Sequence, residues 1–499
     1  MSSPSESGTP SKLTEKTSFI YNTLIVMGGT AIGALITIVA SPVLTRYYTP
    51  DAFGIFAVFS SIVSLISIVV CMRYEVAIVL PKSDGEAINL LALCILIATL
   101  FSLLMIPVLW LLEPQISSLF NLPDLGFYIF IIPLMVFING IFIAFYYWNT
   151  RGRKFKQLAG ARVTSSVVTN GYQLGSAFLG FISAGGLIIG SYLGSFVSTV
   201  ILSSQTLRTD KVKLKSSIRW SSMVSGLKRY RNFPIYDSSA VLLNSLSWQL
   251  PVFLLAAFFS PAVVGFYSLG FRVLYFPMSL IGNSLAQNFI QKAAESKDKI
   301  GQIVERIFEV LVIVGIYPIC LLTLVGADVF MVIFGPAWGE AGIYLQILSI
   351  WSLVWFVSAP LDAVFAVLEK QAYFLRLNIA ILGTRFGSLV IGGFLGDPRL
   401  ALVLFSGTGI LVYGYMNYLI MQLSGVSFQY VKRILIHNSI LFVPAGAVIL
   451  FLKFIMNYSS LAITLASLLI LIAYYVYLLK TNETIKGIFY HITDGRIRI

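Results

Sequence analysis

Apolar runs long enough to cross a lipid bilayer recur along almost the whole sequence. A helix needs about 20 apolar residues to span the hydrocarbon layer of a membrane. Runs of about this length occupy positions 19–44, 53–80, 87–112, 125–149, 158–181, 185–207, 234–259, 264–290, 304–326, 341–367, 373–396, 400–423, 434–452 and 459–479. Lipid cannot satisfy exposed backbone polar groups, so each continuous run must be helical. The pattern predicts an all-α polytopic membrane protein with about fourteen transmembrane helices.

Composition excludes a large soluble domain. Of the 499 residues, 58% are hydrophobic and 11% are charged, whereas a soluble domain carries about a quarter charged residues. The longest polar segment, 208–233, is basic and contains a single carboxylate, Asp210. An enzyme would need a sizeable catalytic loop with several carboxylates. We therefore expect a protein that is not an enzyme and has no catalytic residues.

Basic residues outside the apolar runs fall almost entirely on one side of the predicted membrane. With the N-terminus placed inside, only Arg46, Arg399 and Lys453 lie in outer loops. Lysine and arginine are retained in cytoplasmic loops, so both termini are predicted to be cytoplasmic. The formal net charge of +13 then reflects contact with anionic lipid headgroups, and we expect no nucleic-acid partner.

Metal and cofactor sites have no support in the sequence. Cys71, Cys94 and Cys320 lie far apart inside apolar runs, without metal-binding spacing. His437 and His491 form no cluster. We predict no metal site, no disulfide framework and no cofactor.

The sequence contains an internal repeat. The segment Thr49–Phe56, TPDAFGIF, recurs as Ser260–Tyr267, SPAVVGFY, at an offset of 211 positions. Pro107 and Pro318 match at the same offset. The triplet at 119–121 then echoes the triplet at 333–335 with a three-residue insertion. Three ordered matches at nearly one offset indicate that a six-helix unit was duplicated.

The repeat predicts the domain organisation. Six spans per copy preserve orientation, which implies a pseudo-two-fold axis along the membrane normal and a cleft between two pseudo-symmetric six-helix bundles. Two C-terminal helices fall outside the repeat. The predicted parts are a cytoplasmic tail 1–17, an N-terminal bundle 18–207, a basic linker 208–233, a C-terminal bundle 234–424, helices 13 and 14 at 425–480, and a cytoplasmic tail 481–499. This is the architecture of an alternating-access transporter.

Charged residues inside the predicted spans are the candidate functional residues, because charges at membrane depth are costly. They are Arg73, Glu75, Arg162, Asp237, Arg272, Asp362, Arg376 and Arg385. Arginines outnumber acids, and the planar guanidinium donates paired hydrogen bonds to phosphate oxygens. The excess favours an anionic, phosphorylated substrate over a lipophilic cation.

Arg272 lies about 15 Å below the outer end of its span, at 1.5 Å per residue. We predict that Arg272 binds substrate, together with Arg73 and Arg385; the alternative for Arg272 is an ion pair with Asp237 or Asp362.

Glu75 and Asp362 are the candidates for coupling transport to an ion gradient. On a continuous helix, residues two apart do not face each other, so Arg73 and Glu75 are not expected to pair. Arg162 and Arg376 lie near cytoplasmic helix ends and are expected to snorkel to the interface. Asp237 follows Pro234 and is expected to be a boundary residue.

Two stretches carry a resemblance to a known family. The first is Leu44–Pro50, LTRYYTP, with Phe53–Phe56, FGIF; the second comprises Phe233–Tyr236, Leu243–Ser247, Gln249–Pro251, Val264–Leu269, Arg272 and Pro277. Over nearly its whole length the chain resembles the polysaccharide-transporter branch of the multidrug/oligosaccharidyl-lipid/polysaccharide (MOP) flippase superfamily. Fourteen spans also fit this branch better than the drug-antiporter branch.

The resemblance implies a function. Similar proteins flip undecaprenyl-pyrophosphate-linked oligosaccharides, such as O-antigen, capsule or exopolysaccharide units, across the cell inner (plasma) membrane. Arg272 followed by Pro277 is similar to the arginine that lines the cationic cavity of lipid II flippases. The first span lacks the Arg-Asp pair of those flippases, which disfavours a peptidoglycan precursor as substrate. Membrane lipids, glycosyltransferases and a polysaccharide polymerase are the implied partners. The alternative function is a cation-coupled antiporter for drugs or small solutes, with the same fold.

Overall fold

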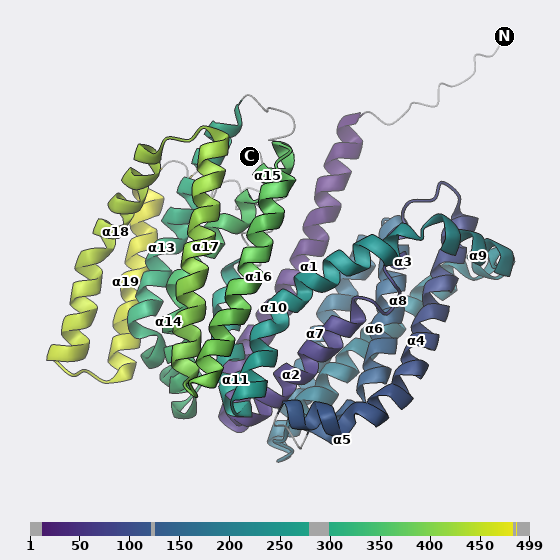
Figure 1. Ribbon diagram of the computed structural model, residues 1–499, viewed down its shortest axis with the longest axis horizontal. Coiled ribbons are helices and arrows are strands. Elements are labelled where there is room, and N and C mark those ends of the chain that lie inside the picture. The colour runs from purple at the N-terminus through teal and green to yellow at the C-terminus, as the bar shows by residue number, and fades with distance from the viewer. Residues whose placement is uncertain (1–11, 121–124, 279–298, 483–485, 487–499) are drawn as a thin grey trace, which may run out of the picture. The chain divides into compact units, whose positions relative to one another are not determined.

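The computed structural model describes residues 12–120, 125–278, 299–482 and 486, and within these ranges the chain is helical and forms no strand (Figure 1). The helices are α1 (Lys12–Tyr47), α2 (Pro50–Ser67), α3 (Tyr74–Ala77), α4 (Asp84–Leu119), α5 (Leu125–Ile129), α6 (Ile132–Arg151), α7 (Phe155–Phe178), α8 (Ala184–Ser217), α9 (Trp220–Arg229), α10 (Ser238–Phe258), α11 (Pro261–Pro277), α13 (Ile300–Ile333), α14 (Gly339–Leu361), α15 (Ala363–Val367), α16 (Gln371–Phe394), α17 (Pro398–Ser424), α18 (Phe428–Leu450) and α19 (Ser460–Thr481). The ends of the predicted tails, 1–11 and 487–499, and the second half of the span expected at 264–290 lie outside the described residues.

Twelve helices in the described ranges are long and apolar enough to cross a membrane. Two more helices account for the remaining predicted spans. α7 has 24 residues but is rich in serine, threonine, asparagine and glutamine. The described part of α11 is apolar but shorter than the other candidate spans. The predicted all-α polytopic membrane fold is confirmed.

One predicted span is not a single helix. The run at 53–80 was expected to be continuous, but α2 ends at Ser67 and the short α3 begins only at Tyr74. Between them, Met72 and Arg73 adopt φ values of 49° and 63°. Such left-handed conformations are uncommon for residues other than glycine and cannot be accommodated in a right-handed helix. The break was not predicted because the run is apolar on both sides of it.

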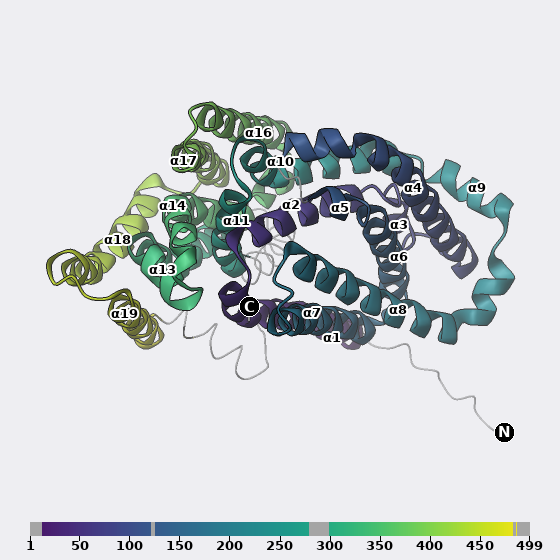
Figure 2. The same ribbon diagram turned by 90° about the horizontal axis from the view of Figure 1, so that it is seen from below.

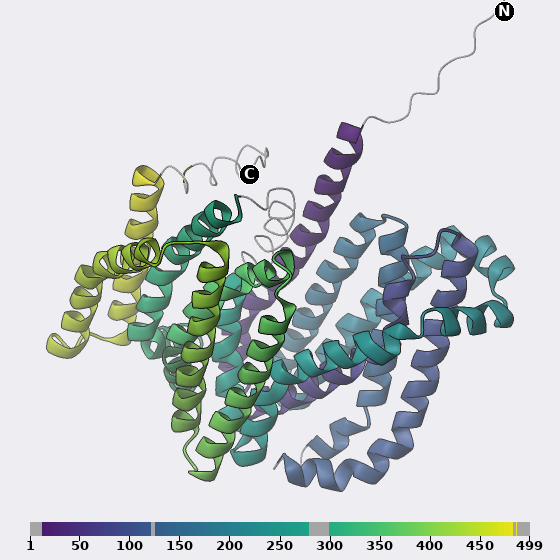
Figure 3. The same ribbon diagram turned by 45° about the horizontal axis from the view of Figure 1, so that its top comes forward.

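The described chain divides into two compact units, residues 1–48 with 55–249, and residues 49–54 with 250–499. In the first unit, α7 packs between α1 and α8, while α6 contacts α4 and α8 (Figure 2). In the second unit, α14 contacts α11, α13 and α17. The last two helices, α18 and α19, pack on α13 and form the edge of this unit (Figure 3).

The duplication is visible in the second unit, which contains the repeat motif twice. Gly54 at the start of α2 lies against the carbonyl of Pro261, and Gly265 at the start of α11 lies against the carbonyl of Pro50. A Cβ on either glycine would collide with the other copy of the motif. The contact is therefore reciprocal, as a local two-fold axis requires.

The third repeat match coincides with equivalent helix ends. α4 ends at Leu119 and is capped by Phe120, while α13 ends at Ile333 and is capped by Phe334. Both helices also contain the matched prolines, Pro107 and Pro318. Position 121 of the first triplet lies outside the described residues.

Candidate functional site: a polar cavity in the first unit

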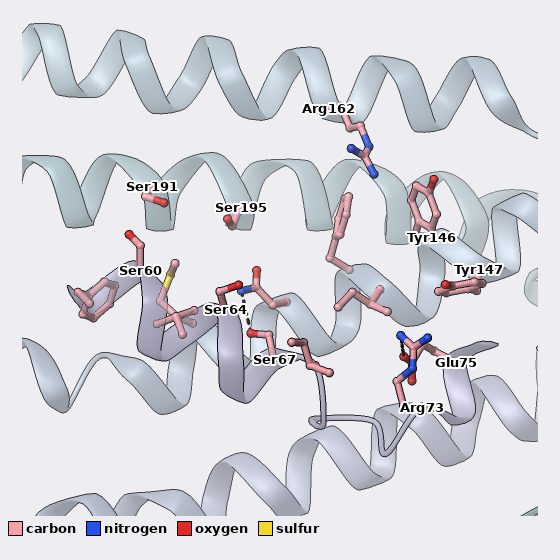
Figure 4. Close-up of a pocket in the computed structure, with 17 residues that line it drawn as sticks. Ser60, Ser64, Ser67, Arg73, Glu75, Tyr146, Tyr147, Arg162, Ser191 and Ser195 are labelled. Atoms are coloured by element: carbon pink, nitrogen blue, oxygen red, sulfur yellow. Dashed lines mark hydrogen bonds and ion pairs between the residues drawn. The ribbon is translucent and has the colours of Figure 1, made fainter. Parts of the chain in front are cut away.

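Helices α2, α6, α7 and α8 of the first unit surround a cavity of about 530 Å³ (Figure 4). A second cavity of about 450 Å³ adjoins it and shares the lining residues Asn139, Phe142, Arg162 and Ser195. Each volume lies within the range of small-ligand pockets, about 300–1,000 Å³. Figure 4 shows serines of α2 and α8 toward one end of the first cavity, and charged and tyrosine side chains toward the other. The cavity is therefore polar at both ends.

Arg73 forms an ion-pair cluster at the charged end. Its Nε donates a hydrogen bond to Asp237 Oδ2 at 2.7 Å, and its Nη1 lies 3.4 Å from Glu75 Oε1. The expectation that Arg73 and Glu75 do not pair was wrong, because it assumed a continuous helix. The left-handed turn at Met72 and Arg73 brings the two side chains to the same side. Asp237, expected to be only a boundary residue, partners Arg73 from the π-helical turn that leads into α10.

Glu75 is the most buried acidic group of this cluster. Its side chain is 3% exposed, whereas that of Asp237 is 40% exposed. Glu75 Oε2 has no hydrogen-bond partner among the described residues. A buried carboxylate oxygen without a partner loses its hydration and gains nothing in return. Glu75 is therefore a group that would gain stability from a proton, a cation or a donating ligand.

Arg162 lines both cavities. Its guanidinium carbon lies 5.4 Å from the centre of the Tyr146 ring, and its Nε is buried without a hydrogen-bond partner. Arg162 makes no ion pair in the described part of the chain. We expected Arg162 to snorkel to the interface; instead it points into the cavity beside Tyr146 (Figure 4). A guanidinium without a carboxylate partner in such a place attracts anions.

Arg272 lies in the second unit, on α11. The residues Tyr267, Phe271 and Tyr275 share one face of this helix and stack in sequence, with ring centroids 5.7 and 6.0 Å apart. Arg272 is rotated about 100° around the helix from Phe271. It is partly buried and makes neither an ion pair nor a hydrogen bond among the described residues. The alternative ion pair with Asp362, which lies in the same unit, does not form among the described residues. The pairing with Asp237, which belongs to the first unit, stays a prediction.

Arg385 and Asp362 also belong to the second unit. Arg385, on α16, is 4% exposed; its Nη2 donates a hydrogen bond to Tyr413 Oη at 3.0 Å, and its guanidinium lies 6.0 Å from the Phe405 ring centre. Asp362, at the end of α14, is partly buried and makes no ion pair in the described ranges. The structure thus brings Arg73 and Glu75 together in one unit and places the other predicted site residues in the other.

A sequence model of the family described as "Polysaccharide biosynthesis protein" matches residues 43–343. The match covers more than half of the chain. The chain belongs to this family. The predicted relation to polysaccharide-handling proteins is confirmed at the level of this family.

Solved structures show which fold this polysaccharide biosynthesis protein shares. The structure of the lipid II flippase MurJ in an inward closed conformation matches with a TM-score of 0.70 and 11% sequence identity, over 92% of this chain and 99% of that chain. The Vibrio cholerae MATE transporter VcmN matches with a TM-score of 0.50 and 18% identity, over 81% and 96%. At these identities the matches show a common fold. No curated relative matches the sequence.

Arg162, Tyr146 and Tyr147 line the cavity of this polysaccharide biosynthesis protein, although none of them was predicted to bind substrate. Arg162 was assigned to the interface, although the unusually polar composition of its helix, α7, was a signal that the helix faces a polar space. Tyr146 and Tyr147 lie at the end of α6 and carried no signal in the sequence that distinguished them from other aromatic residues. The neighbouring Trp148 is buried, and its indole nitrogen donates a hydrogen bond to Asp210 at 3.0 Å.

Proposed function

We propose that this polysaccharide biosynthesis protein is a flippase for polyprenyl-pyrophosphate-linked oligosaccharides. Its substrate would be an O-antigen, capsule or exopolysaccharide repeat unit. Translocation would run by alternating access from the cytoplasmic to the outer leaflet of the cell inner membrane, with both termini cytoplasmic. Glycosyltransferases would supply the substrate and a polysaccharide polymerase would consume it. The family membership and the flippase-like fold support a transporter that handles a lipid-linked substrate.

Arg162 carries the proposal. It is a guanidinium at the junction of two cavities, it has no carboxylate partner in the described ranges, and its Nε is buried without a hydrogen bond. A pyrophosphate would supply both the missing negative charge and the missing acceptors, since guanidinium donates in pairs to phosphate oxygens. A neutral or cationic substrate would supply neither.

The other arginines take supporting parts in this proposal. Arg73 lines the same cavity and would exchange part of its bonding from Asp237 to the substrate phosphate. Arg272 has no protein partner among the described residues and would bind the headgroup at another stage of translocation. Arg385 already bonds Tyr413 and would act through its positive potential, which reaches further in a low-dielectric region.

In this proposal, Glu75 and Asp362 couple transport to an ion gradient. Glu75 has one buried oxygen without a partner, and it lies beside the arginine that would bind the substrate. Protonation of Glu75, or binding of sodium there, would change the charge of the Arg73 cluster and so couple the ion to the substrate. Asp362 would serve the same purpose in the second unit.

A cation-coupled antiporter for drugs or small solutes is the second candidate function. The buried carboxylate of Glu75 in the cavity favours it, and the fold is shared with a MATE transporter. Deleting the gene would then raise sensitivity to cationic dyes such as ethidium and leave surface polysaccharide unchanged. The flippase proposal predicts that the deletion lowers surface polysaccharide and leaves sensitivity to these dyes unchanged.

Replacement of Arg162 tests the proposed function. In a strain without the chromosomal copy, Arg162→Ala should lower surface-polysaccharide output at least about tenfold, because the loss of one charged hydrogen bond costs about 1.5–3 kcal/mol. Arg162→Lys should retain part of the output, because lysine keeps the charge without the planar fork. Protein amounts are compared by immunoblotting of membranes.

Arg376→Ala is the matched control. Arg376 is an exposed arginine near a helix end, stacked over Tyr373 at 5.8 Å, so its loss should leave output unchanged. Wild-type output from Arg162→Ala at a normal protein level would remove the main support for the flippase proposal.

A further inference from the structure

Several serine hydroxyls that line the first cavity are not engaged by the protein's own backbone in the described ranges. Serine hydroxyls in helices commonly donate back to a carbonyl one turn earlier. Ser203 in α8 and Ser349 in α14 do so, with distances of 3.3 and 2.6 Å. Four serines that line the cavity make no side-chain hydrogen bond among the described residues. They are Ser60 and Ser64 on α2, and Ser191 and Ser195 on α8.

These four hydroxyls form two matched pairs. Residues four apart stand on the same face of a helix, about 6 Å from each other. Ser60 and Ser64 therefore lie one above the other on α2, and Ser191 and Ser195 do so on α8. Figure 4 shows the two pairs on opposite sides of the cavity. Each hydroxyl can donate one hydrogen bond and accept others, so the pairs offer bonding capacity of both kinds to a ligand between them.

The adjoining cavity continues this surface. Ser165 and Ser166 on α7 line it, and their hydroxyls also make no hydrogen bond in the described ranges. Asn139 lines both cavities and donates to Ser67 at 3.2 Å. The uncharged polar surface thus extends from one cavity to the other and passes Arg162, which borders both.

A second observation concerns an acidic group beside the first cavity. Glu75 lines the cavity with its side chain 3% exposed, and its Oε2 has no partner among the described residues. A ligand with hydroxyl groups would bond the serines, and it would reach this oxygen only after a shift of the buried Glu75 side chain. The Tyr146 and Tyr147 rings, which line the same end, offer aromatic faces to an apolar ring surface.

A saccharide has this combination of properties. Its ring carries several hydroxyl groups that donate and accept, and its C–H faces are apolar. A lipophilic drug would leave the serine hydroxyls without partners, and a metal ion would require a gathering of acidic or imidazole ligands, which the described residues do not provide. We propose that the serine faces of α2 and α8 form the subsite for the sugar residues of the lipid-linked substrate, beside Arg162, which binds its phosphate. This inference rests on the proposed flippase function and adds the residues that determine sugar specificity.

Sugar binding and phosphate binding can be measured separately with two lipid probes. The probes are synthetic undecaprenyl pyrophosphate without sugar, and the polyprenyl-linked saccharides extracted from the source cells. Native mass spectrometry of the purified full-length protein gives a Kd for each. The Ser64→Ala/Ser195→Ala double variant should raise the Kd for the saccharide lipid about tenfold, as expected for the loss of two hydrogen bonds. Its Kd for the sugar-free lipid should change less than about twofold.

Two control variants test whether the effect depends on the position of the hydroxyl groups and on the hydroxyl groups themselves. Ser203→Ala/Ser216→Ala removes two α8 hydroxyls that bond only their own backbone, and should leave both Kd values unchanged. Ser64→Thr/Ser195→Thr keeps the hydroxyls and should retain tighter saccharide binding than the alanine pair.

The outcomes distinguish the subsite from the function. Equal weakening of both lipids, or no change for the saccharide lipid, would overturn the sugar subsite while leaving a flippase that binds pyrophosphate. If the wild-type protein bound neither lipid, the proposed function itself would fail, and the subsite with it.

Discussion

Repeat-related positions in the two units carry opposite kinds of side chain. At the offset of 211 positions that relates the two copies of the motif, Ser60 on α2 corresponds to Phe271 on α11, and Ser64 corresponds to Tyr275. In the first unit the serines line a cavity. In the second unit the aromatic rings stack on Trp351 and Trp355, with centroids 6.2 and 5.9 Å apart.

The two units show that copies of one bundle can take on different roles. Both copies keep the glycine contact and the equivalent helix ends, because those features hold the helices together. The side chains at these positions have diverged. In the first unit they are hydroxyls that line a cavity and have no partner among the described residues, and in the second unit they are aromatic rings that stack on neighbouring rings. Ring stacking contributes about 0.5–1.5 kcal/mol per pair beyond burial. We infer that the first unit is built for binding and the second is built more for rigidity.

The division of roles between the two units is tested most strongly by giving the first unit the side chains of the second. In Ser60→Phe/Ser64→Tyr the rings would occupy the cavity, so we expect nearly complete loss of surface-polysaccharide output at an unchanged membrane protein level. Ser203→Tyr on α8, outside the cavity lining, serves as the control and should keep wild-type output. Normal output from the double variant would show that the cavity is not on the transport route.

Removing a ring from the second unit should mainly affect stability. Trp351 is 1% exposed and contacts the rings of Phe405 and Tyr413 as well as Phe271. Trp351→Ala should lower the free energy of unfolding by about 3–5 kcal/mol, as for other large aromatic truncations in packed interiors. The measurement is unfolding of the purified protein by titration with a denaturing detergent.

The same measurement on Ser64→Ala sharpens the contrast between the units. Ser64 borders a cavity and bonds no described residue, so its truncation should change stability by less than about 0.5 kcal/mol. Comparable losses for the tryptophan and serine variants would contradict the division into a binding unit and a rigid unit.

The smallest expected effect concerns the ion pair at the edge of the cavity. Asp237 is 40% exposed, and pairs of this kind contribute about 0–1 kcal/mol. Asp237→Asn should therefore lower the unfolding free energy by no more than about 1 kcal/mol, and the difference should shrink at high salt because exposed charges are screened. A loss well above this size that salt does not change would mean that the pair supports the fold.

Membrane class, helix number and duplication followed from the sequence, because each rests on local properties. A run of apolar residues forms a helix in lipid wherever that run is packed, and a repeat can be detected without knowing what it touches. The matched motifs contain both glycines, but only the structure shows their reciprocal contact. The break after Ser67 was not, because left-handed residues other than glycine have no dependable sequence signal.

The composition of the site depended on packing. Arg73 and Asp237 are 164 positions apart in the chain, and Arg162 meets Tyr146 from a different helix. Their encounters depend on how helices cross and rotate, which a hydrophobic pattern does not specify when several faces are apolar. For the same reason, a list of deep arginines contained both Arg73, which lines a cavity, and Arg385, which is packed against Tyr413. Both residues were candidates because they are arginines at membrane depth. Only the neighbours of each side chain in the folded chain show that one lines a cavity and the other is packed.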